Sequence, residues 1–174
     1  DSDVEFRYQT IPELIIKNSD ISIEGVALKT SGSIRLETPS PFIDLVMQLD
    51  KTNIEKVPSF LPLQIKPKLR TWLNHALAGG EITSGDLIYR GYADQFPFKN
   101  VEGKFKAILN ISNATLDYNP DWPPIDNADI ELVFDNEAIY ATSGYGYIFD
   151  ARIKNIAAAI KDITEKDKRV FVEG

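Results

Sequence analysis

The chain has 174 residues, of which 43% are hydrophobic and 26% charged, as expected for a globular domain with a substantial core. Its formal net charge of -7 argues against nucleic-acid partners, which require a basic surface, and against adsorption to an anionic membrane. Cysteine is absent and His75 is the one histidine, which excludes disulfides, thiolate metal sites and the common nucleophilic triads. We expect no nucleic-acid partner, no metal ion and no cofactor.

The N-terminal third of the chain consists of short runs in which apolar and polar residues alternate. These runs begin at Val4, Ile21, Ile34 and Ile43. A period of two is typical of a β-strand with one apolar and one polar face. Three Ser-Gly pairs along the chain predict turns, at Ser31-Gly32, Ser84-Gly85 and Ser143-Gly144. Connections this short favour antiparallel pairing, because parallel strands need crossovers of about a dozen residues.

One amphipathic helix is predicted at about residues 67–78. Apolar residues recur on one of its faces, at Trp72, Leu73, Ala76 and Leu77. His75 falls on the opposite, polar face, where nothing indicates a partner for a catalytic histidine. The Gly79-Gly80 pair is predicted to end the helix, since glycine readily adopts the left-handed conformation of a helix C-cap.

Alternation continues after the helix. The clearest runs are Phe105–Ile111 and Ala128–Phe134, and a third extends from Tyr147 to Ile153. The segment Ile156–Ile163 is ambiguous, because its alanines favour a helix although it continues the preceding run. We favour a strand there.

These strands present more apolar surface than one helix covers. A sheet of eight to ten strands must curl into a sandwich or barrel, or bend into a trough. We predict a mainly β (α+β) fold, a strongly bent antiparallel sheet that forms a trough or U-section groove and carries one helix. The candidate lining residues are apolar positions of the C-terminal runs: Phe105, Ala107, Leu109, Ile130, Leu132, Phe134, Tyr147 and Phe149.

No constellation of catalytic residues stands out, and we predict that the protein is not an enzyme. Asp129 and Glu131 lie on the polar face of an alternating run, as solvated carboxylates do. Carboxylates that meet only in space, as in a hydrolase, remain an open alternative. In the loop YNPDWPPIDN, Tyr118 and Trp122 are candidate anchors for a ligand or partner, unless the loop simply plugs the end of the sheet.

Four stretches, taken in order, resemble one family. They are LPLQIKPKLRTWLNHALAGGEITSGDLIYRG, FPF, GKFKAILNISNATLDYNPDWPPI and IKNIAAAIKDI. Together they are similar to the central region of the YhdP branch of the AsmA-like bacterial envelope proteins. The similarity is strongest over residues 61–163, at Trp72, Leu73, Ala76, Leu77, Gly79, Gly80, Gly91, Phe96, Pro97, Phe98, Ala114, Thr115, Leu116, Tyr118, Pro120, Trp122 and Pro123.

The resemblance implies that residues 1–174 are a single β-rich segment of a much longer protein, consistent with a sequence that starts at Asp1. Such proteins are anchored to the inner membrane of Gram-negative bacteria, span the periplasm and carry phospholipid to or from the outer membrane in a β-groove. The implied partners are phospholipid acyl chains and adjoining segments of the same chain. Open edge strands also predict edge-to-edge self-association of the isolated segment.

The alternative is a closed β-sandwich that binds a protein or a glycan, with Tyr118 and Trp122 as contacts. If the groove prediction holds, we expect Leu132→Asp to block lipid passage and to leave the domain folded.

Overall fold

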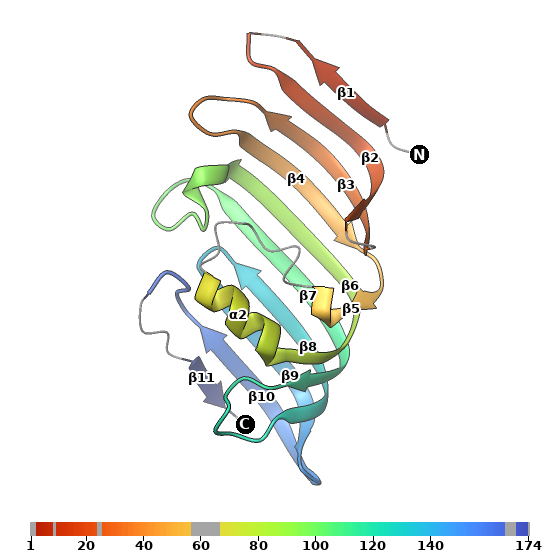
Figure 1. The fold of residues 1–174 in the computed structure, drawn as a ribbon, viewed down its shortest axis with the longest axis vertical. Helices are drawn as coiled ribbons and strands as arrows, with labels where there is room; N and C mark the ends of the chain where they lie inside the picture. Colours follow the sequence, from red (N-terminus) through yellow and green to blue (C-terminus); the bar gives the residue numbers. More distant parts are fainter. Residues whose placement is uncertain (1–2, 9, 24–25, 57–66, 166–169, 174) are drawn as a thin grey trace.

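The computed structural model describes residues 3–8, 10–23, 26–56, 67–165 and 170–173. These residues form one antiparallel sheet and one α-helix, α2 (Pro67–Ala76), which lies across one face of the sheet (Figure 1). The strands are β1 (Asp3–Arg7), β2 (Glu13–Ile23), β3 (Val26–Arg35), β4 (Phe42–Leu49), β5 (Thr52–Asn53), β6 (Leu77–Tyr92), β7 (Lys104–Leu116), β8 (Ile125–Asp135), β9 (Ala138–Ile148), β10 (Ala151–Ile160) and β11 (Val170–Glu173).

Neighbours in the sheet follow the order β1-β2-β3-β4-β6-β7-β8-β9-β10-β11, and β5 pairs with β6 outside this order. Two 3-10 turns, η1 (Ile54–Lys56) and η2 (Ala93–Gln95), complete the described elements. The sheet does not close, so β1 and β11 are its edges. The prediction of a mainly β, antiparallel, bent sheet with one helix is confirmed. All strands of the described residues belong to one sheet, so the closed sandwich is wrong.

The strands are longer than the alternating runs suggested. Ser31-Gly32, Ser84-Gly85 and Ser143-Gly144 lie inside β3, β6 and β9, and their prediction as turns is wrong. Gly32 is required by close packing, because a Cβ there would lie 2.0 Å from the carbonyl oxygen of Asp44 on β4. Glycine within a strand often marks such a close approach of a neighbouring backbone.

The helix ends differently from the prediction. α2 stops at Ala76 and β6 begins at the next residue, Leu77, so the Gly79-Gly80 pair does not cap the helix. Instead, both glycines lie in β6, where the pairing with β7 shifts register. Gly80 has a φ of +125°, and a Cβ on it would lie 2.9 Å from the Cα of Ala114. The pair therefore lets β6 pass close to an irregular part of β7.

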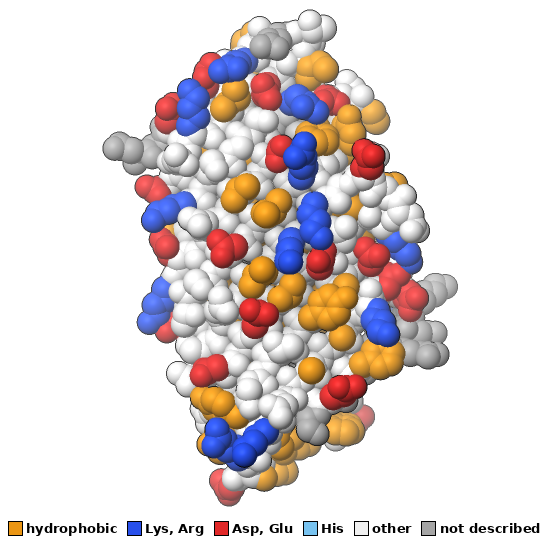
Figure 2. All heavy atoms as spheres, turned by 180° about the vertical axis from the view of Figure 1, so that it is seen from behind, with side chains coloured by type: hydrophobic (Ala, Val, Ile, Leu, Met, Phe, Trp, Pro, Cys, Tyr) orange, Lys and Arg blue, Asp and Glu red, His pale blue; other side chains and the backbone are white. Residues whose placement is uncertain are grey.

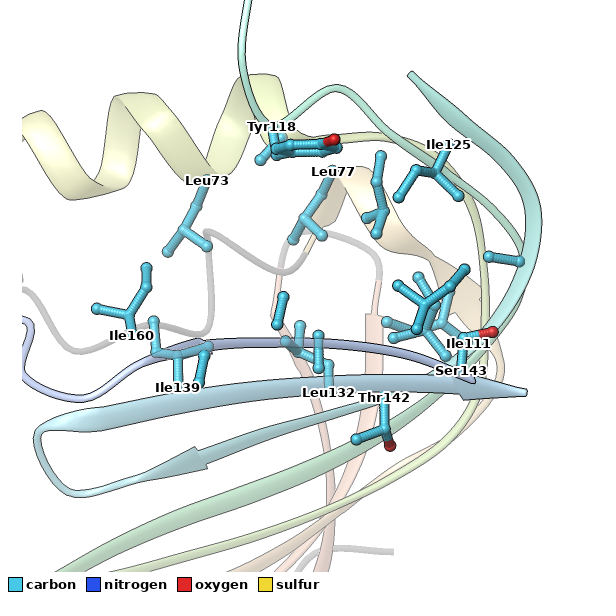
Figure 3. A pocket seen from close by; sticks show the side chains of 18 of the residues that line it. Leu73, Leu77, Ile111, Tyr118, Ile125, Leu132, Ile139, Thr142, Ser143 and Ile160 are labelled. Carbon is cyan, nitrogen blue, oxygen red and sulfur yellow. The ribbon is translucent and has the colours of Figure 1, made fainter. Parts of the chain in front are cut away.

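These irregularities form a crease across neighbouring strands. Asn113 in β7, Asn127 in β8 and Asn155 in β10 all have positive φ, between 51° and 55°. Asparagine tolerates this left-handed conformation better than other residues with a Cβ, and an extra residue in a strand bends it. The backbone N–H of Asn113 donates a hydrogen bond to the Asp129 carboxylate across the crease, at 3.3 Å. The ends of β7 to β10 accordingly curve (Figures 1 and 3).

The sheet has two chemically distinct faces. We call the face covered by α2 the inner face and the opposite one the outer face. In β1–β4 and β6–β10, register places the charged residues on the outer face, and Figure 2 shows this face with charged side chains of both signs and scattered apolar ones. Ion pairs there, such as Arg90–Asp44, are exposed to solvent. Exposed pairs of this kind add little stability.

The predicted strand from Tyr147 to Ile153 is interrupted. Phe149 and Asp150 form the turn of a hairpin, with β9 before it and β10 after it. The ambiguous segment that follows is mainly strand, because β10 extends to Ile160. No helix in the described ranges is long and apolar enough to cross a membrane.

Candidate functional site: the inner face of the sheet

The inner face presents apolar side chains on every strand from β1 to β10 apart from the two-residue β5. Cross-strand partners form continuous apolar rows, one of which joins Leu45, Tyr89 and Phe105 and another Leu109, Leu132 and Ala141. The polar exceptions include Ser19 and Thr30, which pair across β2 and β3 and are buried. This face is therefore an apolar surface shared by nearly all strands of the sheet.

The C-terminal part of the inner face, on β6 to β10, is covered, and we call it the covered part. At one end an aromatic cluster fills it. Phe96 and Phe98, from the loop after η2, pack against Tyr89 and Phe105, with ring centroids 5.2 to 6.4 Å apart. The Phe98 ring lies so close to Gly103 that a Cβ there would be 2.2 Å from it. The FPF motif therefore covers the inner face at this end of the sheet.

The helix covers the remainder of this part. Leu73 and Ala76 point into the sheet and are 1% and 3% exposed. The indole N–H of Trp72 donates a hydrogen bond to the carbonyl oxygen of Tyr118 at 3.0 Å, and the Asp117 amide donates one to the carbonyl oxygen of Ala76. Both bonds join α2 to the segment that follows β7. His75 is exposed, as the helical spacing predicts.

An apolar cavity of about 90 Å³ remains beneath α2 (Figure 3). Its walls come from the helix, from β7 and β8, and from β9 and β10, and include Leu73, Ile111, Ile125, Leu132, Ile139 and Ile160. Thr142 points away from it in Figure 3. The hydroxyl of Ser143 donates a hydrogen bond to the carbonyl oxygen of Tyr145 at 2.6 Å. The cavity thus offers a ligand almost exclusively hydrocarbon.

The N-terminal part of the inner face, on β1 to β4, is different, and we call it the open part. Its apolar side chains include Val4, Phe6, Leu14, Ile34, Ile43, Leu45 and Met47. Val4 and Phe6 are 50% and 47% exposed, and the other five are only half-buried. Among the described elements, neither α2 nor η2 lies over β1 to β3 (Figure 1).

The structure separates the eight predicted lining residues into two groups. Six lie on the inner face in the covered part and are between 2% and 8% exposed: Phe105, Ala107, Leu109, Ile130, Leu132 and Phe134. Tyr147 points to the outer face, because the neighbouring Gly146 faces the inner side chains of Ile125 and Ile156. Phe149 lies in the β9–β10 turn and is 81% exposed.

The two predicted loop anchors differ as well. Tyr118 packs against the core and accepts the hydrogen bond from Trp72 through its carbonyl oxygen. Trp122 is 60% exposed. Sequence reasoning overlooked the open part, although its alternation in β3 and β4 was visible. The signal that distinguishes the two parts, burial by α2, is absent from the sequence pattern.

Two titratable groups near the covered part have pKa values shifted by their surroundings. Burial in the aromatic cluster raises the pKa of Tyr89 to about 12. Burial alone would raise the pKa of Asp162, but hydrogen bonds from Lys99 and Thr164 outweigh that effect and lower it to about 2. The Lys99–Asp162 pair joins the loop after the FPF motif to the segment after β10. In the described part of the chain, no three His, Asp or Glu side chains gather where they would hold a metal ion.

An open antiparallel sheet with an apolar inner face and one helix places this chain among the mainly β proteins. The particular family follows from sequence comparison. The YhdP protein family model matches residues 3–174, and the chain belongs to that family. It is similar to the intermembrane phospholipid transporter YhdP of Escherichia coli (strain K12), with 27% identity over 151 residues. That alignment covers 84% of this chain and 12% of the relative. No solved structure matches significantly.

Proposed function

We propose that this chain is a non-enzymatic segment of a phospholipid-transport protein, and that its inner face shields acyl chains from water between the inner and outer membranes. The observation that carries the proposal is the apolar inner face, which continues across β1 to β4 and leaves Val4 and Phe6 exposed and Leu14, Ile34, Ile43, Leu45 and Met47 half-buried there. Exposed apolar surfaces of this extent usually mark an interaction site. Membership of the YhdP family supports phospholipid as the ligand.

In this proposal the open part is the first contact surface for lipid. Ile34, Ile43, Leu45 and Met47 lie on the adjacent strands β3 and β4 and are only half-buried. The predicted lining residues Phe105, Ala107, Leu109, Ile130, Leu132 and Phe134 continue the same face beneath the helix and the FPF loop. These residues would contact lipid only if an acyl chain entered the space beneath α2 or the FPF loop.

Hydrophobic transfer alone supplies enough free energy for such binding. Each buried methylene contributes about 0.8 kcal/mol, so an acyl chain of about sixteen carbons gains on the order of 10 kcal/mol. Polar recognition is then unnecessary, which agrees with an inner face whose charged neighbours all point outward. The headgroup would remain in water, because burying its charge without a partner is costly.

The location and the partners follow from the same proposal. We propose a periplasmic position within a protein anchored to the inner membrane of a Gram-negative bacterium. Adjoining segments of the same long chain would continue the sheet at β1 and β11, whose outer edges have no strand partner among the described residues. Exposed edges of this kind also predict edge-to-edge association of the isolated segment at high concentration.

The test compares two adjacent residues of β4. Leu45 lies on the inner face, and Val46 on the outer face is 47% exposed. Leu45→Asp is expected to abolish co-purification of phospholipid in native mass spectrometry, because it places a carboxylate in the path of the acyl chain. Val46→Asp adds the same charge and is expected to retain the lipid. The proposal fails if neither the parent protein nor the control carries phospholipid, or if Leu45→Asp binds it normally.

A further inference from the structure

We propose that the cavity beneath α2 binds the terminal methylenes of a single acyl chain, while the remainder of that lipid stays outside the cavity. This inference rests on the proposed function, and it assigns a second subsite, beneath the helix, in addition to the open part. The geometry that points to it is the apolar cavity between α2 and the bent ends of β7 to β10 (Figure 3).

The cavity exists because small residues face one another beneath the helix. Ala141 on β9 pairs with Ala158 on β10, and both line the cavity together with Ala128 on β8. Larger side chains at these positions would reach the helix and fill the space. Protein cores normally leave few voids larger than a water molecule, since side chains interdigitate at crystal-like density. A cross-strand pair of alanines beside a third alanine therefore leaves an unusual amount of space in this core.

The chemistry of the walls selects the ligand. No buried side-chain nitrogen or oxygen of the described residues lacks a hydrogen-bond partner, so the cavity contains no unsatisfied group for a headgroup or a water molecule. Apolar cavities of about 150 Å³ stay dry and bind benzene or xenon. At about 90 Å³ this cavity is smaller, which suits the end of one hydrocarbon chain and excludes a headgroup or two chains.

The cavity also has an amphipathic border. Trp72 and Tyr118 both line it and are both partly exposed. The Trp72 indole is already hydrogen-bonded to the Tyr118 carbonyl, so the two rings present hydrocarbon to the cavity without an unpaired donor. Aromatic side chains of this type suit a boundary with one apolar and one aqueous side. A chain that enters beside them would keep its ester end in water.

The occupant is tested with a phosphatidylethanolamine that carries a photoactivatable diazirine on the terminal carbon of one acyl chain. After irradiation of the purified protein with bound lipid, mass spectrometry locates the attachment sites. We expect labelling of cavity residues such as Leu73, Ile139 and Ile160. A second lipid with the diazirine beside the ester group is expected to leave these residues unlabelled.

Ala158→Leu fills the cavity, and Ala157→Leu is its matched control, because Ala157 is the next residue on β10 and lies on the opposite face. Excluding two methylenes predicts about 15-fold weaker lipid binding for Ala158→Leu and no comparable change for the control. Cavity labelling should disappear in Ala158→Leu and labelling of the open part should remain. Ala141→Leu, from the opposite side of the same pair, replaces Ala158→Leu if circular dichroism shows that the latter does not fold.

The outcomes separate the two proposals. If the terminal diazirine labels only the open part, or if a folded cavity-filled variant keeps cavity labelling and full affinity, the cavity is a packing void and the inference is overturned. If neither lipid labels the inner face of the parent protein, the proposed function itself has failed. Labelling of the cavity by both lipids equally would show that whole lipids displace α2, which also contradicts a subsite for chain ends.

Discussion

The open and covered parts of the inner face share one cross-strand pattern and differ in what lies on them. In both, apolar residues alternate with charged ones, and the register continues without a break from β4 to β6. Among the described residues, α2 and the FPF loop form a second layer over the covered part, where the predicted lining residues of β7 and β8 are buried. In the open part Val4 and Phe6 are exposed, and Ile43, Leu45 and Met47 are half-buried. An identical strand pattern thus makes a core in one place and an accessible surface in the other.

The largest expected difference in stability is between two Leu→Asp variants, one in the covered part and one in the open part. Leu132→Asp places a charge in the covered part and is expected to cost about 4 kcal/mol or more of unfolding free energy. Leu45→Asp, in the open part, leaves its carboxylate accessible to water and is expected to cost about 1 kcal/mol or less. Urea unfolding followed by circular dichroism measures both. Equal losses would mean that the two parts are packed alike, and a stable Leu132→Asp would restore the expectation from the sequence.

A smaller loss is expected where the FPF loop closes the covered part. Gly103→Ala brings a Cβ within 2.2 Å of the Phe98 ring at a φ of +155°, so the ring must move. We expect a loss of about 3 kcal/mol. Gly144→Ala is the control, because a Cβ there meets nothing within 4 Å. Thermal unfolding of the two variants measures the loss. If Gly103→Ala were as stable as the parent protein, the aromatic cluster would adapt freely to the added methyl group.

The attachment of α2 is tested by a still milder change. Trp72→Phe removes the hydrogen bond to the Tyr118 carbonyl and is expected to cost about 1 kcal/mol. It should also accelerate amide hydrogen exchange in α2 while leaving exchange in β2 and β3 unchanged. Trp122→Phe, at a 60% exposed position, is expected to change stability by less than about 0.5 kcal/mol. Faster exchange throughout the sheet in Trp72→Phe would contradict local attachment.

The smallest expected effect is a dependence of the unfolding free energy on pH through Asp162. The pKa of Asp162 is lowered in the folded protein to about 2, so its ionised form stabilises the fold at pH values above its ordinary pKa. That contribution is lost as the pH falls from about 4 to about 2, because the carboxylate becomes protonated. Asp162→Asn should therefore be less stable than the parent at pH 6, and the difference should vanish near pH 2. Asp150→Asn, in the exposed β9–β10 turn, removes one carboxylate as well and is the control for the change in net charge.

Strands and their two faces followed from the alternation of residues, because a period of two has one physical interpretation in an amphipathic chain. The same reasoning placed α2 within two residues and His75 in solvent. It misplaced the ends of the strands, since the glycines of β3, β6 and β9 are consistent with either a turn or a close approach of neighbouring backbones. Tyr147 and Phe149 were misassigned to one continuous strand because a hairpin turn interrupts their alternation without any glycine or proline.

The sequence by itself therefore determined a mainly β protein with an apolar face, a polar face and one helix. Only the tertiary structure decided which portion of the apolar face is accessible. Residues 67–76 precede β8 to β10 by some fifty residues or more, and whether a helix packs on strands so distant in sequence depends on the curvature of the sheet. That curvature arises from the asparagine and glycine bulges of β6 to β10 acting together. The alternation of residues within each strand does not predict the combined bend that these bulges produce.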